Sequence, residues 1–247
     1  MDYFSIQDKK AIVTGGSRGL GKAIAEAFVT HGAEVVIIGK SAMTDEVAPA
    51  LGCFGVRCDL ADRNSRAEGF DEALQLLGGS LDILVNSAGI QRRYKAEDFP
   101  IEDWDEVIEV NLSATFDLCQ RAARVMLPRG YGKIINIASL LSFFGGITVP
   151  AYAASKGGVA QLTKAFANEW ASKGINVNAI APGYMDTDMN IALINDKERY
   201  PKITERIPSR RWGTAGDIAG TAIYLASKGS DYVNGTVIPV DGGYLGR

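Results

Sequence analysis

The sequence is short of the residue that most often builds metal sites and hydrolytic triads. Its 247 residues include one histidine, His31. A histidine-based metal site or a Ser-His-Asp triad would have to use that single residue. His31 stands near the end of a stretch with helical periodicity, where a surface or capping role is the ordinary use of a histidine. We therefore predict no metal cofactor.

Cysteines and long apolar runs are scarce as well. The three cysteines include no C-x-x-C pair, and an odd number is a poor disulfide framework, so we expect inert thiols in a reducing compartment. No run of about 20 apolar residues occurs. The first ten residues are too polar for a signal peptide. These features predict a cytoplasmic protein without a membrane span.

The chain also lacks a strong net charge. Lysine and arginine total 26 against 29 acidic residues, a net charge of −3, which argues against a general nucleic-acid surface. An anionic substrate would then need local basic residues. Apolar residues make up 47% of the chain, enough to build a large core.

Short apolar runs alternate with longer stretches of helical periodicity. Runs that are apolar throughout are typical of strands buried on both faces of a parallel sheet. Stretches such as 20–31 and 104–126 predict the intervening helices. The fold class is therefore α/β, a single Rossmann-type doubly wound parallel sheet of about seven strands flanked by helices. The predicted strands are residues 11–14, 35–38, 54–57, 83–86, 133–138, 175–180 and 236–240.

No linker, repeat or low-complexity tract divides the chain, so residues 1–247 are expected to form one nucleotide-binding domain. The longest irregular stretch, 182–208, mixes helix-forming segments with glycine, proline and aspartate. It follows a strand end, where α/β folds place ligand-binding loops. A mobile substrate loop and a long surface connection are the two interpretations.

A glycine-rich loop follows the first predicted strand. Residues 14–21 read TGGSRGLG, which puts Gly15, Gly19 and Gly21 in a G-x-x-x-G-x-G pattern between a strand and a helix. Glycines permit a tight turn and a close approach to a pyrophosphate, and the next helix offers free N–H groups at its start. In this strand–loop–helix context the loop predicts nucleotide binding.

The end of the second predicted strand lacks the acidic residue that usually binds the ribose hydroxyls of NAD(H). That position falls near Gly39, followed by Lys40 and Ser41. Arg18 and Lys40 together suit a ribose 2′-phosphate through charge-assisted hydrogen bonds, although both also suit solvated surface positions. The sequence thus permits NADP(H) and leaves NAD(H) open.

Two later strand ends also suit a nucleotide. Asp59, after the third predicted strand, suits a hydrogen bond to the adenine amino group. The segment NSAG, which begins at Asn86 after the fourth strand, has small residues that let the chain pass close to a cofactor. A plain turn is the alternative for that segment.

Tyr152 and Lys156 lie four residues apart in a stretch, 151–160, with helical character. That spacing puts both side chains on one helix face. A neighbouring ammonium favours the phenolate, so we expect Lys156 to lower the pKa of Tyr152. Tyr152 would then exchange a proton as hydride moves. Ser139, thirteen residues upstream at a strand end, completes the constellation.

In this order the motifs resemble the short-chain dehydrogenase/reductase family over essentially the whole chain. The family's N-N-A-G motif usually has a second asparagine where Ser87 stands here. The resemblance rests on residues 14–21 and 86–89, Asn111, Ser139, Tyr152, Lys156, Pro182 and Gly183.

The resemblance implies a role for each of these residues. Tyr152 is the general acid/base, Ser139 hydrogen-bonds the substrate carbonyl or alcohol, and Lys156 holds the nicotinamide ribose. Asn111 holds a water that extends a proton relay from Lys156, unless it is a structural amide. Ser142 is a weaker candidate for the contact with the substrate carbonyl. The alternative role for Ser139 is a cap at the end of a strand. Further cofactor contacts are implied at Ser17, Leu20, Leu60, Ala88, Gly89, Pro182, Gly183 and, toward the carboxamide, Thr187.

Several segments resemble one branch of the family, the 2-dehydro-3-deoxy-D-gluconate 5-dehydrogenases. That branch interconverts keto and hydroxy sugar acids from uronate breakdown and is mostly described with NAD(H), which conflicts with the interpretation of Gly39 and Lys40. Gluconate 5-dehydrogenases and 3-oxoacyl-carrier-protein reductases are the alternatives. A non-catalytic regulator is disfavoured because no catalytic residue is missing. The segments are 133–142, 167–170, 176–185, 206–208, 211–213 and 230–235.

A sugar acid needs a cation for its carboxylate. Arg92 and Arg93 directly follow the NSAG segment, at the carboxyl ends of the strands, and one of them would pair bidentately with that group. A solvated or subunit-contact arginine is the alternative, and Arg210 and Arg211 are further candidates. Tyr184 and Trp212 could wall the pocket, although Trp212 better suits core or interface packing.

The resemblance also implies a homotetramer assembled through residues 104–126, 152–173 and 230–247. Periodicity alone does not separate an interface stripe from a core stripe.

Overall fold

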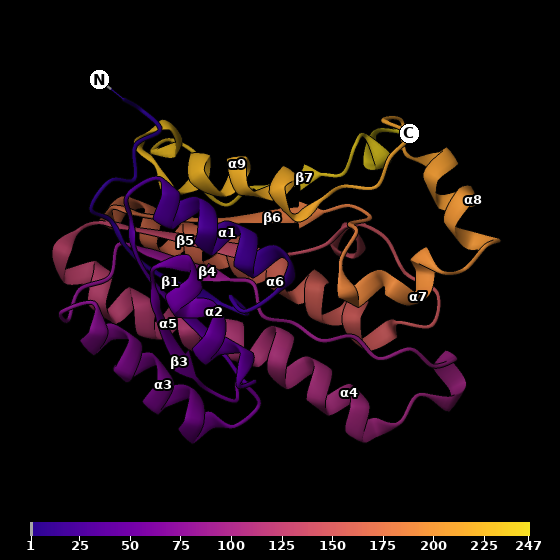
Figure 1. Ribbon diagram of the computed structural model, residues 1–247, viewed down its shortest axis with the longest axis horizontal. Helices are drawn as coiled ribbons and strands as arrows, with labels where there is room; N and C mark the ends of the chain where they lie inside the picture. The colour runs from indigo at the N-terminus through magenta and orange to yellow at the C-terminus, as the bar shows by residue number, and fades with distance from the viewer. Residues whose placement is uncertain (1) are drawn as a thin grey trace.

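Seven parallel strands form one sheet at the centre of the protein, in a computed structural model that describes residues 2–247 (Figure 1). The strand order is β3-β2-β1-β4-β5-β6-β7, so the direction of winding reverses between β1 and β4. That switch point opens a crevice at the carboxyl ends of the strands. The predicted fold class is confirmed. The strands are β1 (Lys10–Thr14), β2 (Glu34–Gly39), β3 (Phe54–Arg57), β4 (Ile83–Asn86), β5 (Gly132–Ile137), β6 (Ile175–Pro182) and β7 (Val237–Val240).

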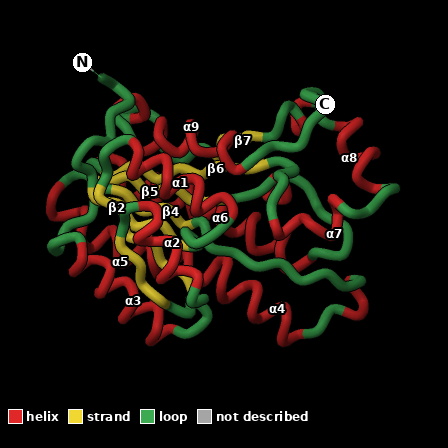
Figure 2. Tube along the Cα trace, viewed as in Figure 1, coloured by secondary structure: helices red, strands yellow, loops and turns green. Residues whose placement is uncertain are grey.

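Helices cover both faces of the sheet (Figure 2). Successive side chains of a strand point to opposite faces, and here both faces are apolar. Val35 and Ile37 pack with α1, α2 and α9, whereas Val36 and Ile38 pack with α3, α5 and α6. The α-helices are α1 (Gly19–Thr30), α2 (Met43–Leu51), α3 (Arg63–Leu76), α4 (Ile101–Ile108), α5 (Ala114–Met126), α6 (Pro150–Trp170), α7 (Ile191–Ile194), α8 (Arg199–Arg206) and α9 (Ala215–Ala226).

The predicted single helix over 104–126 is interrupted. A π-helical turn, η2 (Glu109–Ser113), joins α4 to α5. Its middle residue is the fully buried Asn111. Such a turn inserts one residue into the helical ladder, and it occurs often at functional sites. Apolar periodicity continues across it, which is why the sequence pattern did not reveal it.

The stretch 182–208 is more regular than expected. After β6 the chain forms the 3₁₀ turn η6 (Asp188–Asn190), then α7 and α8, and all three lie beyond the carboxyl ends of the strands (Figure 1). Apolar residues of α7 and α8 pack with Trp212 and Tyr244 in a separate cluster. This α7–α8 segment therefore covers the crevice end of the sheet. The other 3₁₀ turns are η1 (Ala96–Asp98), η3 (Leu127–Arg129), η4 (Leu140–Ser142), η5 (Ala171–Lys173), η7 (Lys228–Ser230) and η8 (Tyr244–Gly246).

The histidine and the cysteines have structural roles. The His31 Nδ1 atom lies 2.7 Å from the carbonyl oxygen of Ala27 at the end of α1, which confirms the capping role. Cys53, Cys58 and Cys119 are free thiols. Burial raises the pKa of Cys53 to about 11 and that of Cys119 to about 12, so both are protonated and unreactive at neutral pH.

Residues 2–247 contain neither a metal-binding cluster nor a membrane-spanning helix. These residues contain no cluster of three or more His, Cys, Asp or Glu side chains that could bind a metal ion. Across the same range, no helix combines the length and the apolar character needed to cross a membrane.

Candidate active site

One large cavity, of about 1190 Å³, lies at the carboxyl ends of the strands. It extends from the glycine-rich loop after β1 to the start of α8. The structure brings nearly all of the residues predicted to bind a cofactor to its wall. These are Gly15, Ser17, Arg18, Gly19, Leu20, Lys40, Asp59, Leu60, Ala88, Gly89, Tyr152, Lys156, Pro182, Gly183 and Thr187.

The glycine-rich loop forms a cradle of the right shape for a pyrophosphate. Gly15 has a φ of +66° and its ideal Cβ would lie 2.9 Å from the Cα of Ala88, so no side chain fits there. Gly19 has a φ of +55°, lines the cavity, and its ideal Cβ would meet no protein atom within 4 Å. Helix α1 starts here with no side-chain cap and no acidic residue in its first turn. Free N–H groups and the helix dipole therefore face this end of the cavity.

The segment after β4 is held against this loop by Thr14. The Thr14 Oγ1 atom accepts hydrogen bonds from the backbone N–H groups of Ser87 and Ala88, each at 3.1 Å. Thr14 is the last residue of β1 and pairs with Asn86 on β4 in the sheet register. Neighbouring strand ends thus fix two walls of the cavity relative to each other.

Asn86 itself does not line the cavity, contrary to the prediction of a cofactor contact. Its Nδ2 atom donates to Asn136 Oδ1 at 2.9 Å and to Cys119 Sγ at 3.2 Å, inside the sheet–helix interface. Side chains alternate along a strand, and the last residue of β4 points into the layer of α5. Its Oδ1 atom has no hydrogen-bond partner among residues 2–247. The cavity is lined by Ser87, Ala88 and Gly89 instead.

Asn111 also lies behind the cavity wall. Its Oδ1 atom accepts from the Ile90 N–H at 2.8 Å, and its Nδ2 atom donates to the Ile90 carbonyl at 3.0 Å and to Ser155 Oγ at 3.1 Å. Both amide hydrogens are therefore used within the protein. Asn111 clamps the segment that carries Gly89, whose ideal Cβ would lie 3.7 Å from Lys156 Nζ. The predicted water relay at Asn111 stays a prediction.

Tyr152 and Lys156 lie one turn apart on α6, which starts at Pro150. The Lys156 Nζ atom is 5.7 Å from the centre of the Tyr152 ring. It donates a hydrogen bond to the Ile137 carbonyl at 2.6 Å. Lys156 is only 4% exposed, and this burial lowers its pKa to about 8. The lysine is thus still mostly an ammonium at pH 7, but it gives up its proton more readily than an exposed lysine does.

The pKa of Tyr152 is raised, not lowered as the spacing to Lys156 predicted. Loss of hydration in the cavity is the largest cause, and it disfavours the phenolate. A hydrogen bond from Ser139 and the positive charge of Arg93 act in the opposite direction. The Lys156 ammonium, 5.7 Å from the centre of the Tyr152 ring, does not offset this loss of hydration. Tyr152 is therefore a neutral phenol at pH 7 and is ready to donate a proton.

The two serines after β5 have different tasks. Ser139 lines the cavity, caps η4 by accepting from the Leu141 N–H at 3.1 Å, and hydrogen-bonds Tyr152. Ser142 Oγ donates to the Lys156 carbonyl at 2.7 Å and accepts from the Ser139 N–H at 3.3 Å. Ser142 thereby ties η4 to α6 and does not line the cavity, whereas Ser139 does.

The arginines predicted as carboxylate ligands differ in their partners. Arg92 is paired with Glu106 at 2.7 Å and with Asp103 at 3.5 Å, so its charge is already neutralised. Arg93 is half-buried, lines the cavity and forms no ion pair within the described residues 2–247. Of this adjacent pair, Arg93 is the arginine with a free charge.

Of the other four residues considered for the substrate pocket, one lines the cavity and three do not. Arg210 bonds the Glu205 carbonyl at 2.9 Å and Arg211 pairs with Asp217 at 2.7 Å, and neither lines the cavity. Tyr184 does line it, whereas Trp212 is buried in the apolar cluster beside it, as its core interpretation predicted.

Lys40 and Asp59 form an ion pair at the far end of the cavity, 2.7 Å apart. The hydrogen bond between them raises the pKa of Lys40 and lowers that of Asp59. An acidic side chain at position 39 would not fit without movement, because an ideal Cβ on Gly39 lies 2.5 Å from Thr44 Oγ1. The absence of the acidic residue is therefore built into the packing of β2 on α2.

Arg199 is the main cavity-lining residue that the sequence did not predict. It is the first residue of α8, it lines the cavity, and its charge lowers the pKa of Arg93. The stretch 182–208 was expected to bear on the substrate, but its charges are mixed in sign. Only the folded α7–α8 segment distinguishes the basic residue that faces inward.

Comparisons with known proteins agree over the whole chain. A family model described as enoyl-(acyl carrier protein) reductase matches residues 15–245. A 2-dehydro-3-deoxy-D-gluconate 5-dehydrogenase of Bacillus subtilis is 51% identical over 100% of this chain and 98% of its own. A gluconate 5-dehydrogenase of Gluconobacter oxydans is 39% identical over 98% and 96%.

A solved structure extends the likeness to three dimensions. The gluconate 5-dehydrogenase of Burkholderia cenocepacia, in complex with NADP and tartrate, has a TM-score of 0.95 and 38% sequence identity. The match covers 100% of this chain and 98% of that one.

Proposed function

Because this chain belongs to the short-chain dehydrogenase/reductase family, we propose that it is an NAD(P)-dependent oxidoreductase of keto and hydroxy sugar acids. The relative from Bacillus subtilis favours 2-dehydro-3-deoxy-D-gluconate and its 5-keto counterpart as the substrate pair. A gluconate 5-dehydrogenase is the second candidate, since two further relatives carry that description.

The observation that carries the proposal is the free charge of Arg93 beside Tyr152. The positive charge of Arg93 stabilises the Tyr152 phenolate, so the two groups share one region of the cavity. A guanidinium without a carboxylate partner suits a planar, bidentate anion such as a substrate carboxylate. The B. cenocepacia relative was crystallised with tartrate, a hydroxy acid. A carrier-bound acyl chain offers no such anion near the reacting carbon.

Proton transfer is assigned to Tyr152 and its hydrogen-bond partner. A nicotinamide cofactor, when bound, would supply the hydride for reduction and accept it in oxidation. Ser139 Oγ orients the substrate oxygen, and Tyr152 donates its phenolic proton to that oxygen as negative charge develops there. Lys156, with a pKa of about 8, is suited to hold the ribose hydroxyls and to return a proton to Tyr152 afterwards.

The cofactor fits the residues present. The Gly15–Gly19 cradle would hold the pyrophosphate, Leu60 would pack on the adenine, and Thr187, which lines the cavity, would reach the carboxamide. Within this proposal NADP(H) is the preferred form. Arg18 and Lys40 both line the adenosine end and are exposed, so both are available to a 2′-phosphate. The surface pair of Lys40 with Asp59 is weak enough for a phosphate to compete with it.

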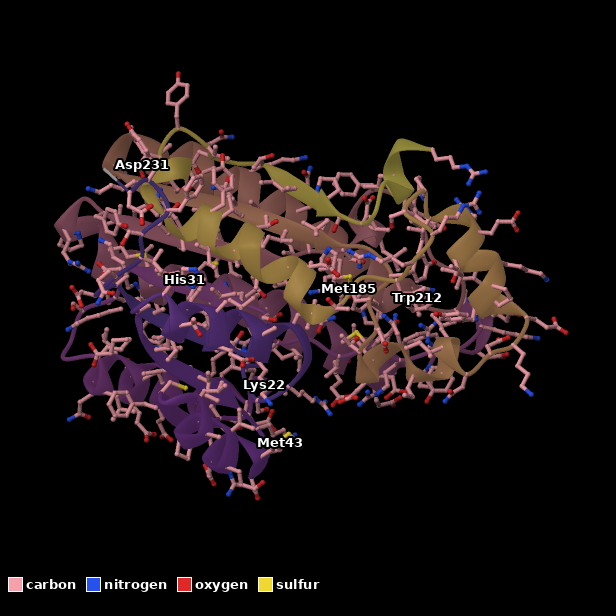
Figure 3. All side chains as sticks on the ribbon, turned by 45° about the horizontal axis from the view of Figure 1, so that its top comes forward. Lys22, His31, Met43, Met185, Trp212 and Asp231 are labelled. Atoms are coloured by element: carbon pink, nitrogen blue, oxygen red, sulfur yellow. The ribbon has the colours of Figure 1, made fainter. Side chains whose placement is uncertain are left out.

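Replacing Lys40 and Arg18 together by alanine should raise the KM for NADPH by about 10- to 100-fold, from the loss of two charge-assisted hydrogen bonds. The KM for NADH should change less than about threefold. The measurement is initial rates with each cofactor at a saturating keto acid concentration. Lys22→Ala is the matched control, because Lys22 lies one turn after Arg18 on α1 and does not line the cavity (Figure 3). An equal loss with both cofactors would contradict the assignment.

A substrate screen tests the proposed function. Purified protein is assayed with NADH and NADPH against 5-keto-D-gluconate, the diketo acids derived from unsaturated uronates, and an acetoacetyl thioester. We expect turnover of one or more of the sugar acids and little turnover of the thioester. Good activity on the thioester with none on any sugar acid would overturn the proposal.

The same proposal includes a homotetramer in the cytoplasm. It is supported by Phe116, which is 43% exposed on α5 within the predicted interface stretch 104–126. Its ring lies 5.9 Å from that of the buried Phe166 on α6, so this exposed apolar side chain lies where α5 meets α6. Three free thiols are consistent with a reducing compartment.

A further inference from the structure

Arg199 is the one basic side chain of residues 184–211 that lines the cavity. The other basic residues of this stretch are exposed or have partners elsewhere. Arg206 lies over the Tyr244 ring at 4.6 Å, Arg210 bonds the Glu205 carbonyl, and Arg211 pairs with Asp217. The remaining two, Lys197 and Lys202, are exposed outside the cavity wall.

Arg199 and Arg93 place two positive charges in one cavity with no anion between them. Within residues 2–247 neither guanidinium has a carboxylate within 4 Å, so neither charge is neutralised by an ion pair. Asp188 also lines the cavity but pairs with neither of them, and Glu106 is already paired with Arg92. Two like charges repel unless a bound anion relieves the repulsion. The arrangement therefore favours an anionic ligand between α8 and the segment after β4.

The backbone at Arg199 is fixed although its side chain is exposed. The Asp196 Oδ1 atom accepts hydrogen bonds from the N–H groups of Glu198 and Arg199, at 3.0 and 2.9 Å, and so fixes the turn that leads into α8. The Tyr200 ring stacks on Trp212 with centroids 5.2 Å apart. The backbone that carries the Arg199 guanidinium is therefore held in one position at the edge of the cavity.

The far end of α8 is anchored as well. The Trp212 Nε1 atom donates to Thr204 Oγ1 at 2.9 Å, and Arg247 donates to the Glu205 carbonyl at 3.0 Å. Figure 3 shows Trp212 beside Met185, and the bridge between Met185 and Gly213 links the two chain segments at the base of α8. Helix α8 is therefore held over the cavity from both ends.

We propose that Arg199 is a substrate-binding residue that closes on the substrate carboxylate from the α8 side, opposite Arg93. This assignment rests on the proposed function and deepens it. The ligand class is a polyhydroxy carboxylate whose acid group is held by two guanidiniums while its carbonyl lies at Ser139 and Tyr152. A substrate without a negative charge gains nothing from either arginine.

Arg199→Gln tests the assignment because it keeps a polar side chain and removes the charge. The KM for the sugar acid that the native protein reduces should rise about 10- to 100-fold, as expected for a lost charged hydrogen bond. The KM for the cofactor should stay within about twofold, and Arg199→Lys should recover part of the loss. The matched control is Lys202→Gln, which removes the same charge three residues further along α8 and should leave every constant unchanged.

A neutral substrate separates carboxylate binding from a general effect on α8. With the amide of the same sugar acid, native protein and Arg199→Gln should have equal KM values. The double variant with Arg93→Gln should lose less than the product of the two single losses, because both arginines bind one carboxylate.

Three outcomes would contradict the role proposed for Arg199. Unchanged KM for the acid in Arg199→Gln would overturn the role of Arg199, and so would an equal loss in Lys202→Gln or an equal loss on the amide. Absence of turnover of every sugar acid by the native protein is a different result, because it overturns the proposed function itself.

Discussion

Replacing Tyr152 by phenylalanine is expected to lower kcat for reduction of a sugar acid by about 10²- to 10⁴-fold. The change removes the one hydroxyl that is positioned by Ser139 and Arg93, while the ring continues to fill its place on α6. Binding of NADPH should stay within about twofold of the native protein, because the glycine-rich cradle is untouched. The measurement is single-turnover reduction at saturating substrate, with cofactor affinity followed by nicotinamide fluorescence.

Tyr94→Phe is the control for this prediction. Tyr94 also lines the cavity, but it lies after Arg93 and its hydroxyl hydrogen-bonds Asp103. Its loss should leave kcat near the native value. If Tyr152→Phe kept more than a tenth of native kcat, the proton would have to come from another group. Loss of NADPH binding in the same variant would show that the fold of the cavity had been damaged.

The raised pKa of Tyr152 also predicts a pH dependence. Because burial favours the neutral phenol, reduction has its proton donor at pH 7 and loses it only as the pH rises through the raised pKa. Oxidation needs the phenolate and should become faster over the same alkaline range. The positive charge of Arg93 favours the phenolate, so it lowers the pH at which both changes in rate occur.

The parts of the site that follow from local sequence were predictable. The spacing of Tyr152 and Lys156 sets one helix face, and the glycines of residues 14–21 set one turn, so neither depends on the rest of the fold. The alternation of apolar runs with helical stretches was enough to give the sheet and its winding. For the loop and the helix face, the information lies within a single short segment of the chain.

Features that depend on distant partners were not predictable. Arg92 and Arg93 are adjacent and chemically identical, and only the acidic side chains of α4 distinguish them. Asn86 looked like a cofactor ligand, yet a partner on β5, Asn136, takes its amide into the interior. The π-helical turn carries Asn111, which bonds the segment at Ile90, a contact that the helical periodicity does not record. Arg199 faces the cavity because α8 folds over it.

The lowered pKa of Lys156 also depends on burial by distant parts of the chain. The spacing to Tyr152 suggested an ordinary ammonium, whereas burial lowers the pKa of Lys156 from 10.5 to about 8. Below pH 8 the folded protein must bind a proton in a poorly hydrated place. The unfolded chain binds that proton freely up to its own pKa. The cost to folding is about 3 kcal/mol at neutral pH, from 1.36 kcal/mol per pKa unit.

Lys156→Met is therefore expected to stabilise the protein while inactivating it. Removal of the buried charge recovers about 3 kcal/mol, and the Ile137 carbonyl left without its donor offsets about 1 to 2 kcal/mol. The net gain of about 1 to 2 kcal/mol at pH 7 corresponds to a rise in Tm of roughly 2 to 8 °C. The gain should shrink as the pH rises from 8 to 10.5, because the native lysine then loses its charge in both states. Thermal unfolding at pH 7 and pH 10 measures both effects.

Activity and stability must change in opposite directions for this account of Lys156 to hold. We expect kcat/KM to fall by about 10²- to 10⁴-fold, because the variant has no ammonium to hold the ribose or to return a proton to Tyr152. Lys164→Met, two turns further along α6 and exposed, removes the same charge and should change neither property. A Lys156→Met protein less stable than native at pH 7 would show that the lysine stabilises the fold. In that case the desolvated lysine would not be a strained functional group that the rest of the fold supports.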